Sequence, residues 1–216
     1  MVEIARNING RGEVLIPGSP VSRFLFRNTA ASWLWLLVRV WVGWKWLSAG
    51  WGKLNNPAWM DGSGQAITSF WQRAVAIPES PARPPITYGW YRGFLQFLID
   101  TGSGEWFSYV IVFGELAVGL GLILGVFVGL AAAGGLTMNL SYMLAGSAST
   151  NPVLAILAIL LILAWRNAGY LGLDRYLLPA LGTPWWRPRR TRSRAVENSV
   201  NESRVAGAAG STGEPR

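Results

Sequence analysis

The sequence predicts an all-α integral membrane protein: a bundle of four transmembrane helices, with an external amphipathic-helix loop between helices 1 and 2. Three observations lead to this fold class. Hydrophobic residues make up 51% of the chain and charged residues only 14%, whereas a soluble domain carries about 25% charged residues. The 13 Trp and 26 Gly suit membrane helices, in which Trp anchors at the interface and Gly is common. Long apolar runs also recur along the chain, as expected for helices that cross a bilayer.

The first apolar run begins after a polar segment. Residues 1–29 contain several Arg and little apolar sequence, so we expect a polar cytoplasmic tail without a site. The first span then covers about 30–52, a length that crosses about 30 Å of hydrocarbon. It contains Arg39 and Lys45, with Lys53 just beyond its end. Charges inside lipid are costly, so we expect them to have partners.

The connection over 53–104 has a pattern of its own. Residues 64–76 have the composition of a short helix, and 88–101 predict a second, aromatic-rich amphipathic helix. The proline-rich stretch 78–85 separates them. Both helices are too short and too charged to span, so we expect them at the membrane surface over the bundle.

Three further spans are predicted at about 105–126, 127–146 and 152–168. Only a Gly-rich junction separates the first two of these, which suits a tight turn between antiparallel neighbours. The whole membrane domain is expected to cover 30–180. We expect 181–216, which is basic and then low in complexity, to be a disordered cytoplasmic tail.

The net charge of +8 comes mainly from Arg residues in the two ends of the chain. Basic residues that flank apolar runs indicate topology, so both termini are placed in the cytoplasm and the long loop outside. The same charge favours anionic lipid. We therefore expect the membrane, rather than nucleic acid, to be the partner of the basic segments.

The sequence contains neither Cys nor His. A Cys/His zinc site, a protein-ligated iron–sulfur cluster and a His- or Cys-ligated haem are therefore excluded, and no metal site is predicted. A Ser-His or Cys-His nucleophile is excluded as well. Any redox chemistry must belong to a bound small molecule or to a partner chain.

Polar residues inside the spans are the candidate site. At about 1.5 Å per residue, Arg39, Glu115 and Asn139 lie roughly 13–18 Å from the inner ends of their spans. We therefore expect an Arg39–Glu115 ion pair near mid-membrane, with Asn139 as a hydrogen-bonding neighbour. Lys45 either snorkels outwards or turns into a cavity. Two interpretations remain open, because the pair either only fixes helix packing or forms a polar pocket for a ligand such as quinone, or a proton relay.

Motifs along the chain resemble those of the DoxX/DoxD family. They are Arg39; the run Ala49-Gly50-x-Gly52-Lys53-Leu54; Glu115 with Gly119 and Leu124-Gly125; Asn139 with Tyr142 and Gly146; and Trp165-Arg166-Asn167-Ala168-Gly169 followed by Leu173-Asp174. The resemblance covers about 30–180 and implies a bacterial or archaeal four-helix protein of the inner membrane. It makes Lys53, Tyr142 and Asp174 secondary candidate positions.

The DoxD branch is associated with thiosulfate:quinone oxidoreductase, as a membrane subunit beside a second polypeptide. The resemblance thus implies a membrane subunit of a redox complex, with quinone as a ligand and with other membrane or periplasm-facing subunits as partners. The alternative is a non-enzymatic scaffold or accessory subunit of a larger membrane complex. A small transporter is the third reading, and whether the chain is itself part of an enzyme stays open.

Overall fold

The computed structural model describes residues 18–182, and this part of the chain is all helical. The helices are α1 (Pro20–Arg27), the 3-10 turn η2 (Thr29–Ala31), α2 (Ser32–Leu54), α3 (Pro57–Met60), α4 (Gln65–Val75), α5 (Gly89–Asp100), α6 (Gly104–Leu124), α7 (Val128–Leu144), α8 (Asn151–Leu163), α9 (Trp165–Ala168) and α10 (Asp174–Ala180). The chain divides into two units, 1–175 and 176–216, and α10 crosses their boundary. Most of the two predicted tails lies outside the described residues.

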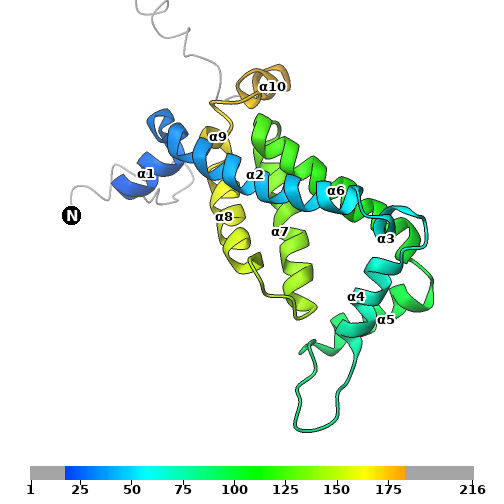
Figure 1. Cartoon of the computed structure of the whole chain (residues 1–216). Helices are drawn as coiled ribbons and strands as arrows, with labels where there is room; N and C mark the ends of the chain where they lie inside the picture. The colour runs from blue at the N-terminus through cyan, green and yellow to red at the C-terminus, as the bar shows by residue number, and fades with distance from the viewer. Residues whose placement is uncertain (1–17, 183–216) are drawn as a thin grey trace, which may run out of the picture. The chain divides into compact units, whose positions relative to one another are not determined.

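Helices α2 and α6 are antiparallel and in contact along most of α2 (Figure 1). Glycine makes this approach possible, because a Cβ on Gly119 would lie 2.6 Å from the backbone nitrogen of Leu47. A Cβ on Gly43 would lie 2.9 Å from the carbonyl oxygen of Gly119. Small residues allow helix backbones to pack closely in membrane proteins. They therefore set the distance and the register between α2 and α6.

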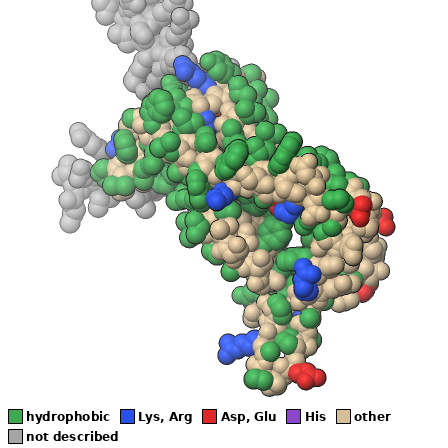
Figure 2. Space-filling view, viewed as in Figure 1, with side chains coloured by type: hydrophobic (Ala, Val, Ile, Leu, Met, Phe, Trp, Pro, Cys, Tyr) green, Lys and Arg blue, Asp and Glu red, His purple; other side chains and the backbone are tan. Residues whose placement is uncertain are grey.

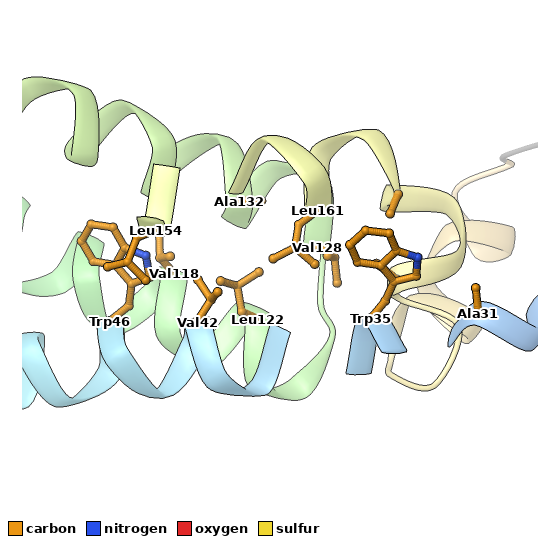
Figure 3. Close-up of a cluster of buried hydrophobic side chains, with 12 residues drawn as sticks. Ala31, Trp35, Val42, Trp46, Val118, Leu122, Val128, Ala132, Leu154 and Leu161 are labelled. Atoms are coloured by element: carbon orange, nitrogen blue, oxygen red, sulfur yellow. The ribbon is translucent and has the colours of Figure 1, made fainter. Parts of the chain in front are cut away.

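Helices α7 and α8 pack side by side against this pair (Figure 1). Figure 3 shows the shared core as a row of buried side chains that ends beyond Trp35 at Ala31 and that includes two indoles, those of Trp46 and Trp35. Between them lie Val42 of α2, Val118 and Leu122 of α6, Val128 and Ala132 of α7, and Leu154 and Leu161 of α8. The core thus draws on all four long helices.

A second core lies where α4 and α5 cover the N-terminal half of α6. Its buried members include Ile67, Trp71, Tyr91, Leu95 and Ile111. Trp71 meets Phe107 of α6 edge-on, with ring centroids 5.2 Å apart. The two helices predicted in the loop are therefore present as α4 and α5, and both pack over the bundle.

The outward faces of the long helices are also apolar. Trp33 and Leu37 of α2 are 67% and 70% exposed, Leu130 of α7 is 73% exposed and Ile156 of α8 is 59% exposed. Figure 2 shows hydrophobic side chains over most of this face of the bundle, while acidic side chains gather near α3 to α5. A soluble monomer rarely exposes contiguous apolar area on this scale. The bundle surface therefore suits lipid.

The four predicted spans coincide in position with α2, α6, α7 and α8. Within residues 18–182, α6 is the one helix that is both long and apolar enough to cross a membrane. Helix α2 has 23 residues but carries three cations, and α7 and α8 have 17 and 13 residues. The fourth predicted span is interrupted at Ala164, where α8 ends and α9 begins. That all four helices cross a bilayer stays a prediction.

The segment 1–29, predicted as a polar tail without a site, contains a helix near its end, α1. Ser19 caps this helix by accepting a hydrogen bond from the N–H of Ser22, and Pro20 occupies the first turn. This Ser-Pro pair is a signal for the start of a helix. The prediction for this segment overlooked it because the segment is rich in Arg and poor in apolar residues. The indole N–H of Trp35 donates to the carbonyl of Leu25 over 2.7 Å, so the end of α1 is fixed to the bundle.

Replacement of Gly119 by Ala is expected to destabilise the protein. The added methyl group would overlap the α2 backbone at Leu47, and such overpacking costs about 1–3 kcal/mol. Thermal unfolding in detergent, followed by circular dichroism, measures the loss. Gly52→Ala is the matched control, because a Cβ at this helical position meets nothing within 4 Å. Equal melting temperatures for the two variants would contradict the packing role of Gly119.

Candidate functional site

The most buried acidic side chain of α6 is neutralised by the end of α2. The Nζ atom of Lys53 lies 2.6 Å from both carboxylate oxygens of Glu115. The hydroxyl of Tyr142 on α7 donates to Oε1 of Glu115 over 3.1 Å. The Glu115 side chain is 1% exposed and that of Lys53 is 21% exposed. We call these three residues the outer polar site, and Lys53 is its link to the surface.

Aromatic rings surround the ammonium group of Lys53. Its Nζ lies 5.1 Å from the ring centroid of Trp59 and 5.9 Å from that of Tyr142. Phe70 of α4 meets Tyr142 edge-on at 6.0 Å. Cation–π contacts stabilise a partly desolvated ammonium group. The cation is therefore held in place by rings as well as by the carboxylate.

Two hollows adjoin the outer polar site, and Tyr142 lines both. The first is a cavity of about 230 Å³ between α4, α5, α6 and α7. Its wall is apolar and mixes aromatic with aliphatic side chains. The aromatic members are Phe70, Trp71, Tyr91, Phe94, Phe107 and Tyr142, the aliphatic ones include Leu95, Leu98 and Met138, and Thr137 and Ser141 are polar. The second is an open groove of about 380 Å³ lined by Lys53, Trp59 and Arg73. A ring-shaped ligand in the cavity would therefore contact the Tyr142 ring, whose hydroxyl bonds to Glu115.

A separate cluster, the inner clasp, contains Arg39 and Asp174. Arg39 is 1% exposed. Its Nη2 donates to the carbonyl of Leu171 over 2.6 Å and its Nη1 to that of Leu122 over 3.2 Å. Asp174 accepts from the backbone N–H groups of Phe127 (2.6 Å) and Val128 (2.9 Å). Backbone carbonyls thus accept from both Nη atoms of the guanidinium, while its Nε is buried without a hydrogen-bond partner among the described residues.

The inner clasp holds the turn between α6 and α7. Phe127 and Gly125 both have positive φ, 46° and 70°, and Asp174 satisfies donors that the start of α7 leaves free. A Cβ on Gly125 would collide with Nη1 of Arg39, so glycine is required there for space as well as for backbone conformation. Burial raises the pKa of Asp174, whereas its two N–H donors and the Arg39 charge act in the opposite direction. The side-chain hydrogen bonds of Arg39 and Asp174 all go to the backbone, so this cluster stabilises the fold.

The predicted Arg39–Glu115 ion pair is wrong. Gly50 of α2 packs against Leu116 of α6, so Glu115 lies level with the C-terminal end of α2. Arg39 lies level with Gly125 instead, because the first two turns of α2 extend past the end of α6. The prediction counted the depth of each charge from the end of its own span and so gave Arg39 and Glu115 the same depth. In the structure the two helices are offset, and the two side chains lie at different levels.

The other two predicted site residues do not join the ion pair either. Lys45 is exposed and lies over the ring of Trp41 at 5.6 Å, away from any cavity described here. Asn139 is fully buried, and neither of its amide atoms has a hydrogen-bond partner among the described residues. Its predicted hydrogen bond to the pair is thus wrong. Whether Asn139 or Lys45 contributes to ligand binding stays a prediction.

Sequence reasoning gave Lys53 and Asp174 only secondary places, although each completes one of the two clusters. One signal for Lys53 was available. Arg39, Trp46 and Lys53 are spaced seven residues apart, which places them on one face of a helix. All three point into the bundle, whereas Lys45 does not share their face. No such spacing could predict the role of Asp174, because its partners are backbone N–H groups in a turn.

These features define a class: an all-helical membrane protein with a buried ion pair and an apolar cavity. Residues 34–148, more than half of the chain, match the model of the DoxX family. The chain therefore belongs to the DoxX family, which is a membrane family. The matched range includes Lys53, Glu115 and Tyr142 but ends before Asp174. No curated protein and no solved structure matches the chain.

Replacement of Lys53 by Met is expected to destabilise the protein by about 3–5 kcal/mol, because Glu115 would remain buried without its counter-charge. The double variant Lys53→Met/Glu115→Gln should recover most of this loss, since neither charge remains. Chemical denaturation in detergent measures all three proteins. Lys45→Met, on the same helix but exposed, is the control and should differ little from the parent. A double variant less stable than Lys53→Met would contradict the ion pair.

Removal of the Asp174 charge is expected to loosen the turn between α6 and α7. Asp174→Asn keeps the shape of the side chain but has one acceptor oxygen for two N–H groups, so about 1.5–3 kcal/mol of stability should be lost. Asp100→Asn is the control, because Asp100 is exposed and accepts only from Gln96 of its own helix. Hydrogen exchange at Phe127 and Val128 should rise in the first variant alone.

Proposed function

We propose that this chain is a four-span subunit of a prokaryotic membrane redox complex and binds a quinone ring beside the outer polar site. The bundle is inserted with both termini in the cytoplasm, so that the outer polar site lies towards the external face. The apolar outer faces of α2, α6, α7 and α8 support this insertion. The excess of Arg in both ends of the sequence supports the orientation.

One observation carries the assignment of the ligand: an apolar cavity, with both aromatic and aliphatic side chains in its wall, is lined by a tyrosine that hydrogen-bonds a buried carboxylate. A quinone is a planar apolar ring with carbonyl oxygens at its edge, so it needs flat walls and a few well-placed donors. The Tyr142 hydroxyl is such a donor. At about 230 Å³ the cavity is smaller than the usual range of roughly 300–1,000 Å³ for whole ligands, so it fits a head group whose tail extends into lipid.

The chain's own residues would hold the quinone rather than reduce it. The sequence has neither Cys nor His to ligate a metal centre, so a second subunit facing the periplasm would deliver the electrons. Reduction of a quinone also takes up protons. Glu115 bonds both to Tyr142 of the cavity wall and to Lys53 of the surface groove, and these contacts support a role for the pair in carrying a proton inwards.

Binding of a short-chain quinone to the purified protein tests this proposal, with quenching of tryptophan fluorescence as the readout. Tyr142→Phe should weaken binding roughly tenfold, the equivalent of one hydrogen bond at about 1.4 kcal/mol. Tyr109→Phe is the control: Tyr109 also lies on a bundle helix and bonds Met60 over 3.4 Å, but it lines neither hollow. If both variants bound the quinone as tightly as the parent, the proposed quinone site beside Tyr142 would be wrong.

The accessory-subunit alternative makes a different prediction for the same experiment. A scaffold would bind no quinone, yet it would still purify in mild detergent with a stoichiometric partner. Binding by the isolated chain that responds to Tyr142→Phe would therefore exclude a purely structural role.

A further inference from the structure

A basic groove lies at the opposite end of the bundle from the outer polar site. It has a volume of about 400 Å³ and is formed by α1 on one side and by the end of α8 with α9 on the other. Ser22, Phe26 and Arg27 line the first side, and Leu163, Trp165 and Arg166 line the second. Among the described residues that line the groove, none is Asp or Glu.

The groove is built by specific contacts rather than by chance proximity of α1. The side-chain amide of Asn167 donates to the carbonyl of Leu25 over 2.7 Å and to that of Asn28 over 3.1 Å. Phe26 stacks on Trp35 with ring centroids 5.8 Å apart. These contacts hold the end of α1 against α9 and α2. The two walls of the groove are thus fixed relative to each other.

The groove lies where the apolar helix α8 ends. Trp165 follows α8 directly, and a Cβ on Gly129, in the first turn of α7, would lie 3.0 Å from its Cβ. Insertion of the bundle as proposed above would place this level at the membrane boundary, where Trp is favoured. Val21 and Phe24 of α1 are exposed at 68% and 49%, as in a helix that lies in the interface with its apolar side in lipid.

The lining combines two guanidinium groups with an apolar floor. Arg166 lies over the ring of Trp165, 5.7 Å from the centroid, and Arg27 comes from the last turn of α1. The planar guanidinium group matches phosphate oxygens and keeps its charge at every physiological pH. Phe26 and Leu163 offer contacts for glycerol and for the first acyl carbons. Basic pockets at the ends of membrane helices suit anionic lipid head groups.

We infer that this groove binds the phosphate of an anionic phospholipid, held between Arg27 and Arg166. The inference rests on the proposed insertion of the bundle in a membrane, but not on its proposed quinone site. The occupant anchors α1 to the bundle from its lipid-facing side, where Val21 and Phe24 are exposed within the described residues.

Lipid-dependent melting of the purified full chain tests the inference. Phosphatidylglycerol added to the detergent should raise the melting temperature, and phosphatidylcholine should not. Arg27→Gln/Arg166→Gln should weaken the phosphatidylglycerol response roughly 30-fold in lipid concentration. The matched control is Arg83→Gln/Arg92→Gln, which removes the same charge from the segment between α4 and α6, at residues that line neither this groove nor the hollows beside the outer polar site, and it should respond like the parent.

Three results would overturn the lipid site: an unchanged response of the Arg27/Arg166 variant, equal stabilisation by phosphatidylcholine, or equal stabilisation by inorganic phosphate, which would indicate a site for the free anion. A cooperative melting transition of the same variant in detergent without added lipid serves as the check that it folds. If the double variant does not fold, Arg27→Gln alone, in the exposed last turn of α1, should give an intermediate response. Failure of membrane insertion would appear separately, as protein released from membranes by an alkaline wash.

Discussion

The close contact between α2 and α6 determines where each buried charge of this chain finds its partner. Gly43 and Gly119 allow the two backbones to meet, and Gly50 against Leu116 fixes their register. In that register the cation at the end of α2 reaches the carboxylate in the middle of α6. The guanidinium two turns from the start of α2 reaches the carbonyls where α6 ends. One helix pair thus generates two polar sites, about fourteen residues of α2 apart along a single face.

The two sites differ in what they leave available to a ligand. In the inner clasp, backbone carbonyls and N–H groups engage Arg39 and Asp174, and both side chains are 1% exposed. In the outer polar site, Glu115 is equally buried, but its partner Lys53 reaches an open groove and Tyr142 lines an apolar cavity. Buried charges in membrane proteins mark either structure or function. In this chain the backbone engages the charges of the inner clasp, whereas the outer polar site has a cavity and an open groove beside it.

The positions of the long helices could be predicted because apolar runs and turn residues are local signals. The partners of the charges could not, since helical periodicity gives the face on which a residue lies and not the axial offset between two helices. That offset comes from glycine contacts such as Gly119 with Leu47. Counting depth from the ends of the spans ignored it, and so paired Arg39 with Glu115. Asp174 was harder still, because it acts on a turn through backbone donors.

Tyr142 links the polar and apolar halves of the outer site, and this has a consequence for ligand binding. Its ring is part of the wall of the cavity, whereas its hydroxyl donates to Glu115. A hydroxyl has only one proton to donate. If a ligand carbonyl accepts the hydrogen bond of the Tyr142 hydroxyl, Glu115 loses that bond and keeps Lys53 as its remaining partner. Occupancy of the cavity and the environment of the buried ion pair would then change together, and that coupling is what a site joining ring binding to proton uptake requires.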